Sequence, residues 1–251
     1  MKASFDLFSE QAESYKKFRP SYPKELYQEI IGHVNQTAQC WDCGTGNGQV
    51  ALALAPYFDK VMATDISSSQ LAQAPVHEAI SYSVSGAEHT SFADNSFDLI
   101  TVAQALHWFD FDAFNREVFR VSKNNGVLAV WGYGLLRIAP ALDEHIDSFY
   151  SQVIGPYWNA RRKHVDTAYA HIPLDFQQIV SKESHFIQVR WNLKHFVGYL
   201  NSWSSVQTYR KKHPGKDPVK AFVSQIAPLW KIEEQKDIRF PIFLKMGRIK
   251  K

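Results

Sequence analysis

The chain lacks most of the features that mark secreted, membrane-spanning or nucleic-acid-binding proteins. Only two of its 251 residues are cysteines, and no stretch approaches the ~18 to 20 apolar residues that span a bilayer. Residues 1–13 carry charges throughout and so lack the apolar core of a signal peptide. The net charge is only +3 and the basic residues are scattered, so neither nucleic acid nor a membrane surface is an expected partner. These absences favour a soluble cytoplasmic protein.

The two cysteines form the pattern Cys40-Trp41-Asp42-Cys43. A zinc site would need further thiol or imidazole ligands, and Asp42 is better explained by the glycines that follow it, so no metal is expected. Two thiols so placed indicate a reducing compartment. The main basic run, residues 161–164, is expected to be the solvated face of a helix.

The most informative stretch is residues 41–50, where Gly44, Gly46 and Gly48 occupy alternate positions. A short apolar run precedes them, and residues 50–55, rich in alanine and leucine, follow and stop at a proline, which predicts a strand, a tight turn and a helix. Glycine accepts positive φ at little cost, and its missing Cβ lets a ligand approach the backbone. A ligand pocket is therefore expected at the end of the first strand.

An acidic residue extends this pattern. The apolar run of residues 61–66 contains Asp65, roughly twenty residues after Gly44, and in a βαβ unit this spacing places a carboxylate beside the glycine turn, where it can accept both hydroxyls of a ribose. Dinucleotide enzymes favour G-x-G-x-x-G, whereas these glycines alternate and follow Asp42. The pattern indicates a cofactor that contains a nucleoside.

An acidic residue followed by G-x-G-x-G resembles the first motif of class I S-adenosylmethionine-dependent methyltransferases. The resemblance implies S-adenosyl-L-methionine as the cofactor, whose ammonium group an acidic residue beside the loop can meet. Residues 92–100, Phe-Ala-Asp-Asn-Ser-Phe-Asp-Leu-Ile, resemble the matching stretch of the type 11 methyltransferases. In that family the residue after the third strand lies by the adenine, so Ala87 and Glu88 inherit that role by position. The predicted cofactor-binding residues are Asp42, Gly44, Thr45, Gly46, Gly48, Asp65, Ile66, Ala87, Glu88, Gln104 and Trp108.

Alternating strands and helices predict an α/β fold, a doubly wound, mostly parallel sheet of seven strands like the Rossmann fold, with helical insertions after the fifth strand. One methyltransferase domain over residues 1–251 is expected. Its parts are an N-terminal helical lid at 1–33, a cofactor-binding core at 34–134, a helical cover at 135–185 and 192–232, and final strands at 186–191 and 238–247.

Several helix ends are also predicted. Ser67, Asn192 and Asp217 are expected to begin helices, as is Asp112, whose helix should bury Phe114, Val118, Phe119 and Val121 and close at residues 124–126. Residues 139–153 and 157–170 are expected to be helical, and Pro241 should interrupt the last strand or lie at an edge.

The end of the fourth strand should face the reactive sulfonium, because ligands of open α/β sheets bind outside the carboxyl ends of the strands. A sulfonium cation is attracted to aromatic faces, which gives Trp108 a physical role, with core packing as the alternative. His107 is the candidate catalytic base, and the alternatives are a hydrogen-bonded structural histidine or a residue that holds the turn.

The acceptor side is expected to be roofed by residues 15–22, an aromatic and basic loop stiffened by prolines, unless these rings simply cover the core. Arg19 could pair with a small anionic acceptor while aromatic rings exclude water. The predicted substrate-binding residues are Tyr15, Arg19, Tyr22, His107, Tyr133 and Trp203.

Three motifs carry a narrower resemblance: Tyr-x-x-x-Arg-Pro-x-Tyr at 15–22, Leu-His-Trp-Phe at 106–109 and Gly-Tyr-Leu-x-Ser-Trp-Ser at 198–204. Together they resemble the branch that includes trans-aconitate methyltransferases, which implies methylation of a small molecule and favours a carboxylate acceptor and a methyl ester product. Two alternatives stay open: a nicotinamide-dependent oxidoreductase on a similar sheet, and a regulatory protein that binds S-adenosylmethionine without catalysis.

Overall fold

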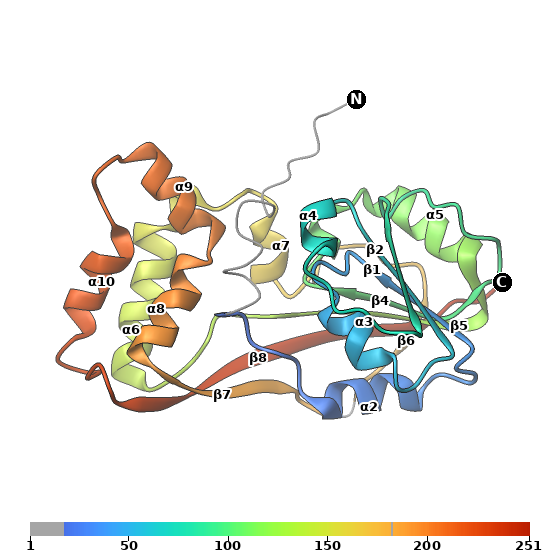
Figure 1. The fold of residues 1–251 in the computed structure, drawn as a ribbon, viewed down its shortest axis with the longest axis horizontal. Coiled ribbons are helices and arrows are strands. Elements are labelled where there is room, and N and C mark those ends of the chain that lie inside the picture. The colour runs from blue at the N-terminus through green and yellow to red at the C-terminus, as the bar shows by residue number, and fades with distance from the viewer. Residues whose placement is uncertain (1–17, 182) are drawn as a thin grey trace.

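The computed structural model describes residues 18–181 and 183–251, which form a mixed β-sheet with helices on both faces and a second group of helices at one end (Figure 1). The strands are β1 (Gln39–Cys43), β2 (Lys60–Asp65), β3 (Ile80–Val84), β4 (Phe97–Ala103), β5 (Ser122–Tyr133), β6 (Gln177–Ile179), β7 (Phe186–Asn192) and β8 (Gln235–Arg248). They follow the order β3-β2-β1-β4-β5-β8-β6, and β7 pairs with β8 off this path.

The first five strands run parallel, and the order reverses between β1 and β4. This is the doubly wound sheet predicted from the sequence, with one strand more than the seven expected. The extra strand is the short β6, which pairs antiparallel to β8. The reversal creates a switch point at the carboxyl ends of β1 and β4, which is where such sheets bind ligands.

Helices cover the two faces of the parallel part through separate apolar clusters. The helices before the insertions are α2 (Lys24–Gly32), α3 (Gln49–Leu54), α4 (Ser68–Leu71) and α5 (Phe111–Val121). Buried side chains of α2 and α3 pack with Cys40 on one face, whereas those of α5 pack with Trp41 and Cys43 on the other. The two thiols are therefore part of the packed interior, and no group of three metal-binding side chains occurs among the residues described.

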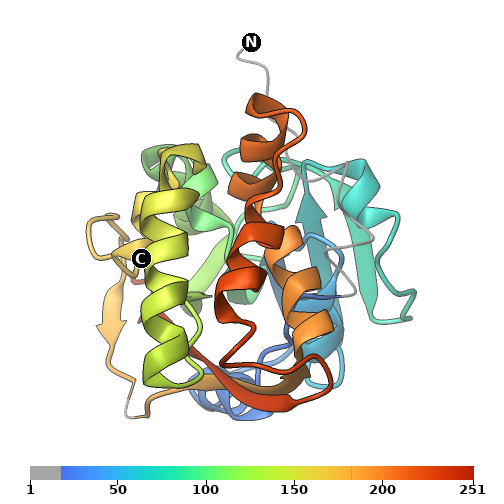
Figure 2. The same cartoon turned by 90° about the vertical axis from the view of Figure 1, so that its left-hand side faces the viewer.

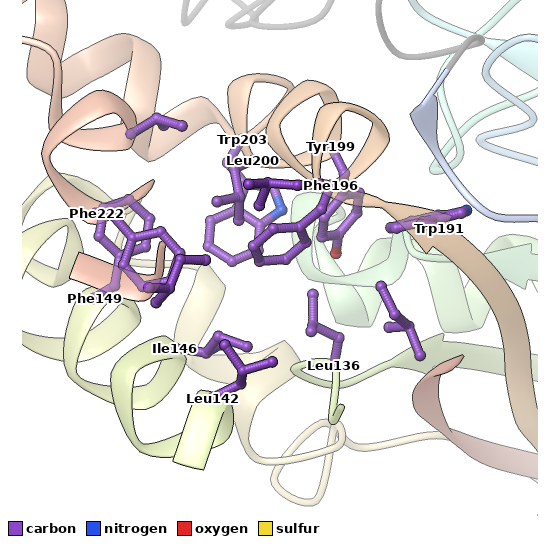
Figure 3. Close-up of a cluster of buried hydrophobic side chains, with 14 of the residues drawn as sticks. Leu136, Leu142, Ile146, Phe149, Trp191, Phe196, Tyr199, Leu200, Trp203 and Phe222 are labelled. Carbon is purple, nitrogen blue, oxygen red and sulfur yellow. The ribbon is translucent and has the colours of Figure 1, made fainter. Parts of the chain in front are cut away.

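The helical cover contains α6 (Pro140–Ser148), α7 (Arg162–Asp166), α8 (Leu193–Asn201), α9 (Ser204–Lys212) and α10 (Pro218–Ile226). The short turns η3 (Phe149–Val153) and η4 (Gly155–Tyr157) connect α6 to α7, and a third short turn, η2 (Leu106–Trp108), follows β4. Figure 2 shows α6, α8 and α10 side by side at the end of the sheet. Their apolar faces share one cluster with Leu136, Trp191 and Trp203 (Figure 3). The predicted insertions after the fifth strand are thus packed helices with their own core.

Strand β8 connects this cover to the sheet. Its second half pairs with β5, and its first half pairs with β7, with the change of partner at Pro241. The strand was expected to be interrupted or at an edge here, but it continues, and the carbonyl of Pro241 accepts from the N–H of Gly134 at 2.9 Å. Proline is tolerated because the ladder changes sides at this residue.

Some predicted helix ends are correct and others are wrong. Ser67, Asn192 and Asp217 cap α4, α8 and α10 as expected. Helix α5, however, is capped by Asp110 instead of Asp112, because the Asp110 carboxylate accepts from the N–H of Ala113 at 3.0 Å. Phe119 was expected inside and is 48% exposed.

The other corrections concern lengths. Helix α5 ends at Val121 and β5 begins at once, so residues 124–126 belong to a strand instead of a helix end. The segment expected to be one helix over 139–153 consists of the α-helix α6, which ends at Ser148, followed directly by the wider π turn η3. Of residues 157–170 only α7 is helical, since the chain turns back on itself after Asp166. No helix in the described residues has the length and apolar character required to cross a membrane.

Candidate active site

The glycine turn after β1 has the backbone form that the sequence predicts. Gly44, Gly46 and Gly48 have φ values of 69°, 56° and 78°. A Cβ at Gly44 would lie 2.6 Å from Cβ of Ala105, so the turn packs directly on the end of β4. At Gly46 the nearest atom outside the turn would be 4.0 Å away, which leaves the room for a ligand to approach at this glycine.

Asp65 lies beside this turn, as its spacing from the glycines predicted. One carboxylate oxygen accepts from the N–H of Gly46 at 2.8 Å, and the other accepts from the N–H of Ser67 at 2.9 Å. The next residue, Ile66, leaves 56% of its side chain exposed. A carboxylate and an apolar side chain thus stand together at the open part of the glycine turn.

Asp42 is buried beneath the glycine turn and is not exposed at its surface. The residue is only 1% exposed, and its carboxylate accepts hydrogen bonds from the hydroxyls of Thr45 and Thr101. Burial raises the pKa of Asp42 to about 6, and the two hydroxyl hydrogen bonds oppose that shift. In this structure Asp42 braces the turn, and its predicted contact with a ligand ammonium group stays a prediction.

Three further predicted cofactor residues lie at the carboxyl edge of the sheet. Ala87 is buried, and the carboxylate of Glu88 accepts from the N–H of Asp110 at 3.0 Å, which ties the loop after β3 to the start of α5. Gln104 has a left-handed backbone with φ of 54°, and its side-chain amide donates to the carbonyl of Tyr133 at 3.1 Å. Such a conformation is uncommon outside glycine, and here Gln104 joins the ends of β4 and β5.

His107 is buried in the turn η2 directly after β4. Its Nδ1 lies 2.9 Å from the hydroxyl of Tyr169, and its ring lies 4.9 Å from that of Trp108. Burial, together with the charges of Arg162, His164 and Arg161, lowers the pKa of His107 to about 3. His107 is therefore neutral throughout the physiological range, which makes it a weak base.

Four of the six predicted substrate-binding residues converge at the end of β5. Arg19 donates from Nη1 to the hydroxyl of Tyr133 at 2.9 Å and from Nη2 to the carbonyl of Ser202 at 3.3 Å, and its guanidinium lies 5.3 Å from the ring centre of Tyr199. The ring of Tyr22 is 6.1 Å from that of Tyr133, and the ring of Trp203 is 5.5 Å from that of Tyr199.

The other two behave differently. Among the residues that the structure describes, His107 contacts Tyr169 and Trp108 instead of this group, and Tyr15 lies outside the described residues.

Known proteins with similar sequences agree with this geometry. Residues 41–130 match a family model described as a methyltransferase domain. A Dictyostelium discoideum protein named as a methyltransferase is 32% identical, over 97% of this chain and 95% of that protein. A solved structure from Anaeromyxobacter dehalogenans, described as a type II methyltransferase, is 34% identical with a TM-score of 0.86, over 93% of this chain and 99% of that one. The chain belongs to the class I S-adenosylmethionine-dependent methyltransferases.

A more distant relative of this methyltransferase names the cofactor. A Saccharomyces cerevisiae protein named as an S-adenosylmethionine-dependent methyltransferase is 22% identical, over 88% of each chain. Family membership implies S-adenosylmethionine as the cofactor and gives no support to an oxidoreductase. The finer resemblance to the trans-aconitate branch is not confirmed by these relatives and stays a prediction.

The structure of the methyltransferase also reveals residues that the sequence did not single out. Arg162 was expected on a solvated face, but its Nε donates to the hydroxyl of Tyr150 at 2.9 Å, and its guanidinium lies 4.9 Å from the ring centre of Trp158. Trp158 in turn lies 5.7 Å from Trp203. Arg162 acts electrostatically on both His107 and Tyr199, so it lies between the end of β4 and the group around Arg19.

Little in the sequence could have identified these residues. Arg162 stands in a run of four basic side chains, and nothing in the run separates it from its neighbours. The aromatic residues at 149–158 were the available signal, since rings concentrated in an insertion after strand five are able to line a pocket.

Proposed function

We propose that this methyltransferase transfers the methyl group of S-adenosylmethionine to a small anionic molecule, with a carboxylate as the acceptor and a methyl ester as the product. The observation that carries the proposal is Arg19, which is oriented by Tyr133 and Ser202 and lies over Tyr199. A guanidinium fixed in this way suits a carboxylate, which it can bind through two parallel hydrogen bonds.

The glycine turn fits the cofactor on three counts. Gly46 leaves room for close approach, Asp65 offers oxygens for the ribose hydroxyls, and Ile66 presents exposed apolar surface for the adenine. We assign the remaining predicted cofactor residues to the same pocket: Asp42, Gly44, Thr45, Gly48, Ala87, Glu88, Gln104 and Trp108. Of these, Asp42 and Thr45 support the turn from behind, through their mutual hydrogen bond.

The acceptor pocket is proposed to lie between the end of β4 and the helical cover. Arg19 and Arg162 both lie close enough to Tyr199 to act on it electrostatically, and both charges oppose the rise in the pKa of Tyr199 that burial causes. The terminal nitrogens of Arg162 make no hydrogen bond to any residue that the structure describes. Two guanidinium groups among aromatic rings provide positive charge and exclude water, which favours an anionic acceptor.

The reaction needs no strong base when the acceptor is a carboxylate. The cofactor supplies a methyl group already activated by its positive sulfur, and the new C–O bond forms as the C–S bond breaks and sulfur takes the electron pair. A carboxylate is ionised at neutral pH, so no proton has to leave. The low pKa of His107 agrees with this chemistry, because a histidine at about 3 is a poor base for a phenol or an amine.

An acceptor screen tests the proposal. The protein is incubated with S-adenosylmethionine labelled in the methyl group and with panels of matched small carboxylates, phenols and amines, and products are separated by mass. We expect labelled products from the carboxylate panel alone. These products should be methyl esters, so treatment with base should hydrolyse them and release the label as methanol. Methylation of phenols or amines without any ester contradicts the carboxylate assignment, and cofactor binding without any product supports the non-catalytic alternative.

A further inference from the structure

His107, which follows β4, forms a hydrogen bond with Tyr169 of the helical cover. Tyr169 follows α7 and is 0% exposed, and its hydroxyl lies 2.9 Å from Nδ1 of His107. The ring of Tyr169 packs edge-on against Phe243 at 5.0 Å. Phe243 in turn occupies the space above Gly132, where a Cβ would lie 2.5 Å from its ring. This packing fixes the phenol from behind and directs its hydroxyl at the imidazole.

The backbone that delivers Tyr169 is unusual. Ala168 and Tyr169 have φ values of 50° and 56°, so two consecutive residues other than glycine adopt the left-handed conformation. The N–H of Tyr169 donates to the carbonyl of His164 at 2.7 Å and closes the turn. Left-handed residues with a Cβ cost energy and persist where surrounding contacts over-determine them, often at functional sites. This turn brings the hydroxyl of Tyr169 to His107.

The hydrogen-bond direction follows from the chemistry of the two groups. A neutral imidazole nitrogen is a much better proton acceptor than a phenol oxygen, so the Tyr169 hydroxyl donates and Nδ1 of His107 accepts. A neutral imidazole that accepts at Nδ1 carries its proton on Nε2. Nε2 makes no hydrogen bond to any described residue, and it is not among the buried atoms that lack a partner, so it keeps some exposed surface.

Burial lowers the pKa of His107 and keeps this imidazole neutral, and three positive or ionisable groups of the cover act in the same direction. Arg161 donates to the carbonyls of His107 and Trp108, and Arg162 and His164 also act on the ring through their charges. A second proton on His107 would be repelled by all three. An anionic acceptor is attracted by the same charges, and an N–H group that points at it adds a hydrogen bond.

We propose that Tyr169 is a positioning residue that holds His107 as the neutral tautomer with its proton on Nε2, so that His107 donates a hydrogen bond to the anionic acceptor. The part that concerns the acceptor rests on the proposed function, whereas the tautomer does not. His107 then orients the nucleophile and removes no proton, which replaces the base role considered from the sequence.

Nuclear magnetic resonance of protein labelled with ¹⁵N-histidine and saturated with S-adenosylhomocysteine tests the tautomer directly. We expect Nδ1 of His107 to show the signature of a nitrogen that lacks a proton and Nε2 that of a protonated nitrogen. Both signals should stay constant from about pH 5 to about pH 8, where an ordinary histidine titrates. His107→Gln assigns the signals by their loss. A proton on Nδ1, or titration in this range, overturns the proposal.

Two tyrosine variants separate positioning from general structure. Tyr169→Phe should give His107 a mixture of both tautomers while the melting temperature shows a folded protein. Tyr157→Phe is the matched control, because the hydroxyl of Tyr157 lies 2.7 Å from Nε2 of His213. It should alter the His213 signals and leave those of His107 unchanged. A folded Tyr169→Phe protein with unaltered His107 signals contradicts the positioning role.

The donor role is tested with any carboxylate that the wild-type protein methylates. His107→Gln places an amide N–H near the position of Nε2, so kcat should fall less than about tenfold, whereas loss of a general base costs about 10²- to 10⁴-fold. His107→Leu should raise the acceptor KM more than His107→Gln does. If no carboxylate is methylated, the proposed function fails while the tautomer result still stands; a loss of 10²-fold or more in His107→Gln refutes the donor role.

Discussion

The difference between two glycines of one turn gives the sharpest test of where the cofactor lies. Gly44 and Gly46 both have positive φ, so alanine at either position costs roughly 1–2 kcal/mol of stability through the backbone. At Gly44 the new methyl group would also lie 2.6 Å from Cβ of Ala105, an overlap that adds about 1–3 kcal/mol. At Gly46 the nearest atom is 4.0 Å away, so only the backbone cost applies.

Ligand binding should show the opposite order. A methyl group at Gly46 enters the space that the ligand is proposed to use, so Gly46→Ala should weaken S-adenosylhomocysteine binding by at least about tenfold, which is about 1.4 kcal/mol. Chemical denaturation gives the stabilities, and calorimetry on the folded fraction gives the affinities. The reasoning is refuted if Gly46→Ala binds S-adenosylhomocysteine as tightly as wild type, or if Gly44→Ala is no less stable than Gly46→Ala.

Three other predictions concern the acceptor, the buried carboxylate and the thiols. Arg19→Ala should raise the acceptor KM by at least about tenfold, the scale of a lost charged hydrogen bond, and leave S-adenosylhomocysteine affinity unchanged in calorimetry. The pKa of Asp42 is raised from 3.8 to about 6, so the folded state holds this proton more tightly and wild-type stability falls as pH rises from about 4 to about 6, by up to about 3 kcal/mol. Asp42→Asn should remove that slope in denaturant titrations, and an equal slope in both proteins refutes the assignment. Burial raises the pKa of Cys40 and of Cys43, so both thiols should resist thiol reagents until the protein unfolds. If the thiols only pack in the interior, the double variant Cys40→Ser/Cys43→Ala should keep S-adenosylhomocysteine binding. Stoichiometric zinc in freshly purified protein would contradict this packing role.

The sequence predicted the parts of the fold that depend on local patterns. The glycine turn, the position of Asp65 beside it and the parallel strands all follow from spacing along the chain, because a βαβ unit brings residues roughly twenty apart to the same edge of a sheet. The caps at Ser67, Asn192 and Asp217 follow from side chains that bond the next turn of backbone.

The parts that depend on distant contacts were not predictable. Strand β6 has only three residues and forms because β8 offers an edge. Arg162 has no sequence signal of its own, since its contacts with Tyr150 and Trp158 depend on how the turns between α6 and α7 arrange the chain. The motif predicts that Asp42 meets the ammonium group of the ligand, but it did not reveal that the hydroxyls of Thr45 and Thr101 enclose the Asp42 carboxylate. Tertiary packing decides such positions.

The central claim is that the methyltransferase binds S-adenosylmethionine through Asp65 and the glycine turn. Calorimetry of S-adenosylhomocysteine with wild type and with folded Asp65→Ala tests it most directly, with NADH as the competing ligand and melting temperatures measured for both proteins. The account predicts saturable binding of S-adenosylhomocysteine to the wild type and none of NADH, and a loss of about 1–3 kcal/mol, or roughly 5- to 150-fold, in Asp65→Ala. Equal affinity of the two proteins for S-adenosylhomocysteine, or tight binding of NADH in its place, would contradict it.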